Sequence, residues 1–201
     1  MGAIIDYYFA PISGYAYLGH QSLMALAAKA QATVVFKPLV IGKVFAASET
    51  TPPFAQSAPR KSYRIADQAR WAMAKGLVMN EVPAHWPTDP VPACKTIIAA
   101  GALGADQDAI SFGCLRAVWA EEKNIADTAV LEEVLTKAGA DASTILTLAE
   151  TTPIAAQVET ITDAAIAAEV FGSPTYVLNG ERYWGQDRLA FLEAVLMQEA
   201  A

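Results

Sequence analysis

The 201-residue sequence contains little charge, since 17% of its residues are charged and 54% are hydrophobic. Acidic residues outnumber basic ones, which gives a formal net charge of −7 at pH 7. A protein that binds the phosphate backbone of nucleic acid or an anionic membrane needs a basic surface. We therefore expect neither nucleic acid nor a membrane as a partner, although a local basic pocket can still bind a small anion.

Cysteine is also scarce. Cys94 and Cys114 are the two cysteines, and they form no Cys-x-x-Cys motif. Disulfide exchange needs an attacking thiolate and a second thiol that releases the product. We therefore exclude a dithiol oxidoreductase and predict that both cysteines are buried thiols that act as small apolar side chains. We predict no metal site.

Long apolar runs are absent. No segment is apolar over the roughly 20 residues that a membrane-spanning helix needs. The first residues, MGAIIDYYFAP, contain no basic region, no sustained apolar run and no small-residue cleavage site. We therefore expect a soluble cytoplasmic protein.

The sequence instead contains an ordered series of predicted strands and helices. Residues 3–11 and 32–40 are rich in β-forming residues, and a segment with helical periodicity separates them. Between about Gly42 and Val170 the pattern is helical. A hairpin signal follows at Asn179-Gly180, and a last helix starts near Asp187. The helices expected in the central part span residues 59–76, 91–104, 107–123, 128–139, 142–150 and 152–170.

This order of elements resembles the thioredoxin fold of the DsbA-like group. The resemblance implies an α/β protein in which a helical domain is inserted between an N-terminal β-α-β unit and a C-terminal β-β-α unit. The implied thioredoxin-like domain is discontinuous, at residues 1–42 and 171–201, and the all-helical insertion covers residues 43–170. It also implies a cis peptide bond before Pro174, with the backbone of Ser173 facing a bound thiol peptide.

Ser13 stands at the first strand-to-helix junction, where the nucleophilic cysteine of such a fold would lie. Ala16 stands where the resolving cysteine would lie. A serine at this position is commonly an N-cap. Together with the free N–H groups of a helix start, it could also stabilise a bound thiolate. Both roles remain open from the residues alone.

Two motifs are similar to those of 2-hydroxychromene-2-carboxylate isomerases and kappa-class glutathione transferases. They are DYYFAPISGYAYLG at residues 6–19 and FGSPTYVLNGERYWGQDRL at residues 171–189. The similarity implies glutathione as the cofactor and Ser13 as the catalytic residue. Asp187 could equally cap the last helix, and Trp184 could belong to the core. The implied glutathione contacts are Ser13, Ser173, Pro174, Trp184, Gly185, Gln186 and Asp187.

The same similarity implies that Lys43, Thr50, His85 and Trp86 bind an aromatic carboxylate. Lys43 follows the second strand and could pair with the carboxylate, although it could also be an ordinary exposed lysine. Thr50 stands where kappa enzymes carry an asparagine before a Pro-Pro step. His85 could also transfer a proton near neutral pH.

Several other polar residues are expected to have ordinary roles. We expect His20 to be packed or at the surface. Arg64, Asp67 and Arg70 lie at three-residue spacing, which is typical of a solvated ladder of ion pairs. Gly14 replaces the proline that usually follows the family's serine.

The leading prediction is a glutathione-dependent cis–trans isomerase of 2-hydroxychromene-2-carboxylate-type substrates, in the catabolism of aromatic compounds such as naphthalene. We expect a homodimer. A kappa-like transferase, which would conjugate glutathione to an electrophile and release the adduct, would use the same residues. A non-catalytic thioredoxin-fold module that binds peptides remains a further alternative, and it would have no affinity for glutathione.

Overall fold

The structure is a computed structural model that describes residues 2–199. Its sheet contains the strands β1 (Ile4–Phe9), β2 (Thr33–Pro38), β3 (Thr175–Leu178) and β4 (Glu181–Trp184), in the order β2-β1-β3-β4. β1 and β2 are parallel, whereas β3 is antiparallel to both β1 and β4. The predicted β-α-β and β-β-α units are therefore confirmed, and they form one mixed sheet.

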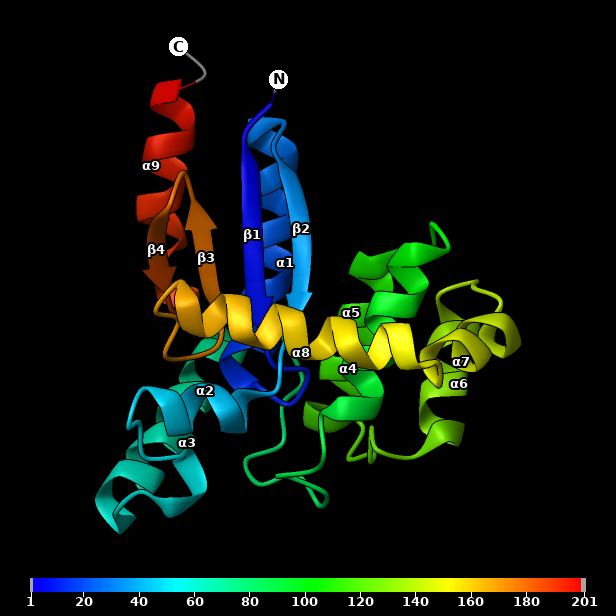
Figure 1. Ribbon diagram of the computed structural model, residues 1–201. Helices are drawn as coiled ribbons and strands as arrows, with labels where there is room; N and C mark the ends of the chain where they lie inside the picture. Colours follow the sequence, from blue (N-terminus) through cyan, green and yellow to red (C-terminus); the bar gives the residue numbers. More distant parts are fainter. Residues whose placement is uncertain (1, 200–201) are drawn as a thin grey trace.

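Helix α1 (Gly14–Ala30) connects β1 to β2 and lies behind the sheet in Figure 1. A helix of this length supplies the crossover that two adjacent parallel strands require. Helix α9 (Leu189–Glu199) follows β4 and contacts α1. Helix α8 (Thr152–Ala167) runs across the front of the sheet at the carboxyl ends of β1 and β2 (Figure 1).

All regular elements between β2 and β3 are helices. Among the described residues, the sequence did not predict α2 (Ile41–Ala47), whose two turns are too short to display a clear period, or the 3-10 turn Pro53–Ala55. The division at residues 42 and 170 into two domains stays a prediction, because one hydrophobic core extends from the sheet into these helices. The remaining helices are α3 (Ala58–Lys75), α4 (Val91–Ala102), α5 (Gln107–Trp119), α6 (Thr128–Lys137) and α7 (Ala142–Ala149).

Stacked aromatic rings form the centre of the core. Tyr7 on β1 lies opposite Tyr176 on β3, and their ring centroids are 5.6 Å apart. Tyr7 also stacks on Phe9 at 4.4 Å. Rings arranged in this way contribute beyond the area that they bury. These ring contacts thereby join β1 to β3.

Both cysteines are buried and free, as predicted. Burial raises the pKa of the Cys94 thiol well above its ordinary value and that of Cys114 to about 12. Within residues 2–199, no helix combines the length and the apolar character needed to cross a bilayer.

Candidate functional site

The strand pairing brings Ser13 next to Ser173, although 160 residues separate them in the sequence. Tyr8 near the end of β1 pairs with Thr175 at the start of β3, so the loop before β3 lies beside the start of α1. The Ser13 hydroxyl donates to the Ser173 carbonyl at 3.0 Å, and the Ser173 hydroxyl accepts from Ala10 N–H at 2.9 Å. These bonds join the two motifs that the sequence predicts to be functional.

Ser13 is also the N-cap of α1, because its Oγ accepts from Ala16 N–H at 3.2 Å. The hydroxyl therefore satisfies one helix N–H group and uses its own proton on Ser173. The peptide bond between Ser173 and Pro174 is cis, as the motif predicts. A second cis peptide bond, which the sequence did not indicate, joins Trp86 to Pro87.

Two tryptophans hold the loop that precedes Ser13. The indole N–H groups of Trp86 and Trp119 both donate to the Ile12 carbonyl, at 2.9 and 3.1 Å. Their ring centroids are 5.6 Å apart, and Trp119 is fully buried. Because a carbonyl oxygen has two lone pairs, it can accept from both rings. The backbone at the start of α1 is thus fixed by residues from α5 and from the loop after α3.

Close packing explains why a glycine stands at position 14, where the family usually has a proline. A Cβ atom added at Gly14 would lie 2.4 Å from Gln68 Nε2 and 2.9 Å from the Trp119 ring. The absence of a side chain therefore lets α3 approach the first turn of α1. Gln68 occupies the space gained and is 4% exposed.

A cavity of about 310 Å³ opens beside Ser13, and we call it the Ser13 cavity. This volume lies at the lower end of the ~300–1,000 Å³ that is typical of sites for small molecules. Its walls are mostly apolar and contain the aromatic rings of Phe45, Phe54 and Trp86. The Pro-rich part of the long loop, Pro52–Phe54, lines it as well. The polar side chains among its lining residues are Ser13, Tyr15, Arg64, Gln68, Thr88 and Ser173.

The predicted ladder on α3 is wrong for Arg64 and Asp67. The guanidinium carbon of Arg64 lies 4.6 Å from the centroid of the Trp86 ring, and Arg64 lines the Ser13 cavity. Asp67 accepts a hydrogen bond of 2.8 Å from the hydroxyl of Tyr15, another lining residue. Burial, followed by this bond, raises the pKa of Tyr15 above its ordinary value. Charges at three-residue spacing do not reveal which face of a helix is solvated. The orientation of α3 is set by the residues against which it packs.

The sequence model of the DSBA-like thioredoxin domain matches residues 4–197. The chain belongs to the DsbA-like thioredoxin-domain family.

Within this DsbA-like family, the chain is similar to proteins named 2-hydroxychromene-2-carboxylate isomerase. The enzyme of that name from Sphingobium xenophagum is 27% identical over 199 residues, which cover 98% of this chain and 100% of the relative. A solved structure of 2-hydroxychromene-2-carboxylate isomerase matches with a TM-score of 0.81 and 25% identity, covering 98% of this chain and 96% of that one. The cytosolic disulfide reductase DsbM of Pseudomonas aeruginosa, solved with GSH, matches at a TM-score of 0.66 and 20% identity, over 96% and 99% of the two chains, which shows the fold alone.

The C-terminal motif of this DsbA-like chain adjoins the cis proline. Gly185 N–H donates to the Pro174 carbonyl at 2.9 Å, and the φ of Gly185 is 104°, a conformation that favours glycine. Gln186 is buried against Gly19, and its Oε1 has no hydrogen-bond partner. The predicted glutathione residues 184–187 thus adjoin Ser173 and Pro174 through the bond from Gly185.

The two outer residues of this motif are accessible. Trp184 is 52% exposed, packs on Phe171 at 4.7 Å and closely approaches Gly172, so it is not a core residue. Asp187 lies in the 3-10 turn Gln186–Arg188, and its carboxylate pairs with Arg188 at 2.6 Å. Both side chains remain available to a ligand at the surface.

Of the predicted substrate residues, Trp86 lines the Ser13 cavity, whereas Lys43, Thr50 and His85 are not among its lining residues. Lys43 forms an exposed ion pair with Glu159 on α8. The Thr50 hydroxyl bonds Ser48, and His85 is exposed in the loop before Trp86. Their roles stay predictions.

His20 is fully buried, which agrees with the expected packing role. Its Nε2 lies 2.7 Å from Asp108 on α5, and its Nδ1 lies 3.4 Å from the Tyr7 hydroxyl. Asp108 is 88 residues away in the sequence, so the residues around His20 could not predict this contact.

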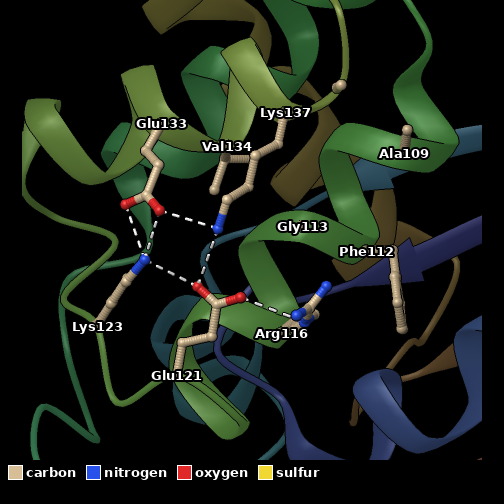
Figure 2. Close-up of a pocket in the computed structure, with 10 residues that line it drawn as sticks. Ala109, Phe112, Gly113, Arg116, Glu121, Lys123, Glu133, Val134 and Lys137 are labelled. Carbon is tan, nitrogen blue, oxygen red and sulfur yellow. Dashed lines mark hydrogen bonds and ion pairs between the residues drawn. The ribbon is translucent and has the colours of Figure 1, made fainter.

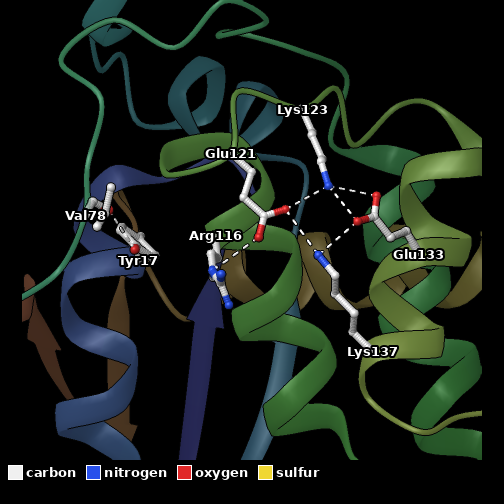
Figure 3. Close-up of polar contacts among 7 residues, drawn as sticks. All are labelled: Tyr17, Val78, Arg116, Glu121, Lys123, Glu133 and Lys137. Carbon is white, nitrogen blue, oxygen red and sulfur yellow. Dashed lines mark hydrogen bonds and ion pairs between the residues drawn. The ribbon is translucent and has the colours of Figure 1, made fainter.

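A second hollow lies between α5 and α6, with a volume of about 220 Å³ (Figure 2). We call it the ion-pair hollow, because its charged residues form a network of ion pairs. Figure 3 shows this network together with a separate contact on α1, where the Tyr17 hydroxyl donates to the Val78 carbonyl. Glu133 bonds Lys123 through both oxygens, at 2.7 and 2.8 Å, and Lys137 at 2.9 Å. Glu121 pairs with Lys123 at 2.9 Å, and with Arg116 and Lys137 at longer range. The network consists of Arg116, Glu121, Lys123, Glu133 and Lys137.

Proposed function

We propose that this protein is a glutathione-dependent cis–trans isomerase that acts on 2-hydroxychromene-2-carboxylate-type substrates in aromatic catabolism. The observation that carries the proposal is the bond between Ser13 and the Ser173 carbonyl at the mouth of an aromatic-walled cavity. The full-length similarity to proteins named for this isomerase supports it.

The residues present fit glutathione at this place. A peptide that pairs with the backbone of Ser173 would have its sulfur near the start of α1. The first N–H groups of a helix have no intrahelical acceptors and favour a negative charge. The Ser13 cavity opens beside this helix start, because Ser13, Gly14 and Tyr15 are among its lining residues. The segment from Trp184 to Asp187 would receive the γ-glutamyl part, where the Asp187 carboxylate can accept from an ammonium group.

Ser13 would change its partner when the peptide binds. In the structure its proton is directed at the Ser173 carbonyl. This carbonyl can accept from a peptide N–H as well, and a thiolate, as a charged and therefore stronger acceptor, would draw the Ser13 proton to sulfur. When bound, glutathione supplies the thiol whose reversible addition to the conjugated substrate permits rotation about the former double bond.

The remaining residues would orient the substrate and exclude water. The rings of Phe45, Phe54 and Trp86 offer flat apolar walls for an aromatic substrate. Trp86 is fixed by its bond to Ile12, so the wall and the serine share one support. Holding two reactants in register is worth several orders of magnitude in rate.

The test is incubation of the protein with glutathione and 2-hydroxychromene-2-carboxylate, with the product identified by NMR. The proposal requires a trans product, no net consumption of glutathione and no reaction when glutathione is omitted. An accumulating glutathione adduct would identify a transferase instead. If equilibrium dialysis with labelled glutathione detects no binding, the proposal is wrong and a peptide-binding module becomes the better interpretation.

A further inference from the structure

The Ser13 cavity contains an unbalanced charge. Among the described residues that line it, Arg64 is the one charged side chain, and the other polar lining residues are neutral. Burial lowers the pKa of the Arg64 guanidinium from its ordinary value, because the charged form has lost part of its water. Arginine nevertheless stays protonated at any physiological pH. A ligand with one negative group would therefore complement this cavity.

Arg64 is held in position but is not satisfied. Its guanidinium lies over the Trp86 ring, whose own N–H group is bonded to Ile12. Its Nε atom is buried and has no hydrogen-bond partner. A buried donor without a partner is costly, so a ligand that supplies an acceptor at this place would remove that cost. The nearest acid on the same helix, Asp67, is occupied by Tyr15.

Gln68 lies four residues after Arg64 and thus on the same face of α3. It is 4% exposed, its Oε1 is buried without a partner, and its amide nitrogen packs against Gly14. Two polar side chains on one face of α3, Arg64 and Gln68, therefore line the cavity, and Gln68 reaches the residue after Ser13.

We propose that Arg64, with Gln68 beside it, binds the carboxylate of the aromatic substrate in the Ser13 cavity. Guanidinium groups recognise carboxylates through two parallel hydrogen bonds. Arg64 packs on Trp86, and Trp86 bonds the carbonyl of Ile12, the residue before Ser13. A carboxylate at Arg64 is therefore held in a fixed position relative to Ser13. The ring of the substrate then occupies the apolar part of the cavity between the anion site and the sulfur site.

The sequence had indicated Lys43 for this role. The structure instead pairs Lys43 with Glu159, and neither residue lines the Ser13 cavity. The two assignments make opposite predictions for single substitutions, so one set of variants decides between them.

The experiment is calorimetric titration of the protein, without glutathione, with 1-naphthoate and with the neutral 1-naphthamide. The wild type binds naphthoate more tightly than the amide. Arg64→Met lowers the affinity for naphthoate about 10- to 100-fold, which is the loss typical of a hydrogen bond to a charged group. It leaves the affinity for the amide unchanged. Arg64→Lys recovers part of the loss, because it restores the charge without the two parallel donors.

The matched control is Arg70→Met, which removes an exposed arginine from the same helix and should bind naphthoate as the wild type does. Lys43→Met tests the competing assignment, and the Arg64 assignment requires that it keep its preference for naphthoate over the amide. Arg64→Gln accompanies Arg64→Met, so that a folding defect in one variant, detected by thermal unfolding, leaves the other informative.

Three results would overturn the inference: equal affinities of the wild type for naphthoate and the amide, equal losses for both ligands in Arg64→Met, or a selective loss of naphthoate binding in Lys43→Met. The inference rests on the proposed function for the identity of the reaction, but the two can fail separately. If the wild type catalyses no isomerisation and Arg64 still selects naphthoate, the proposed function alone is wrong. If isomerisation proceeds and Arg64→Met leaves KM unchanged, the assignment of Arg64 alone is wrong.

Discussion

The Ser13 cavity and the ion-pair hollow are both concave and both contain charge, but their polar groups are arranged in opposite ways. In the ion-pair hollow, two carboxylates and three cations satisfy one another (Figures 2 and 3). In the Ser13 cavity, one cation and one amide remain buried without full partners. The first arrangement is complete in itself, whereas the second is completed by a ligand.

The difference shows that charge density alone does not identify a binding site. The ion-pair hollow contains more charged residues, yet an incoming ligand would have to displace bonds that already exist. Exposed ion pairs of this kind contribute little to stability individually. The Ser13 cavity offers unpaired groups within apolar walls, which is the arrangement expected of a site for a small molecule.

The largest expected effect comes from Ser13→Ala. We expect turnover to fall about 10²-fold or more while glutathione still binds, because one donor to the reacting charge is lost and the peptide contacts are retained. The measurements are steady-state kinetics and equilibrium dialysis with labelled glutathione. Ser13→Thr keeps the hydroxyl and is expected to retain much of the activity. Unchanged turnover in Ser13→Ala would reduce Ser13 to a helix cap, and the contrast between the two hollows would then rest on Arg64 and Gln68 alone.

A smaller effect is expected from Gly14→Ala. The added methyl group collides with Gln68 and with the fixed ring of Trp119, so we expect a loss of about 1–3 kcal/mol in the free energy of unfolding. Urea denaturation measures this loss. The matched control is Gly42→Ala in α2, where nothing lies within 4 Å of the new methyl group. This control should be neutral or stabilising, since alanine favours helix. Equal stability of the two variants would mean that α3 does not pack on α1 as described.

The thiol of bound glutathione should ionise below its solution pKa, by about one unit, because helix N–H groups and a hydroxyl donor favour the thiolate. The measurement is a titration of thiolate absorbance in the ultraviolet, from which the signals of free enzyme and free glutathione are subtracted. The chain's own thiols do not interfere, because burial raises the pKa of both cysteines. An unshifted thiol would leave the Ser13 cavity without an activated nucleophile.

The smallest effect should come from Glu133→Gln in the ion-pair hollow. Its bonds to Lys123 and Lys137 lower the pKa of Glu133 to about 2, from about 4.3 for an unfolded chain. The stability that it contributes is therefore present above about pH 4.3 and is lost as the pH falls through 2. The variant should show less acid dependence in that window and unchanged turnover. Urea midpoints across pH measure the first effect, with Glu132→Gln as the control. A fall in turnover would mean that the hollow takes part in function.

The sequence predicted the order of strands and helices well, because hydrophobic periodicity and the Asn-Gly turn are local signals. It also brought Ser13 and Ser173 into one hypothesis through the resemblance of two motifs. It did not identify Arg64 or Gln68, since their role depends on which face of α3 meets α1. That choice is made by Gly14 and Trp119, which are far from α3 in the sequence.

The shared acceptor at Ile12 has an optical consequence. Of the four tryptophans, Trp86 forms part of the cavity wall and Trp119 packs directly behind it. Their fluorescence therefore originates next to the Ser13 cavity, whereas half-exposed Trp184 lies in the segment proposed to receive the γ-glutamyl part of glutathione. Intrinsic tryptophan fluorescence can therefore report ligand binding without an attached label.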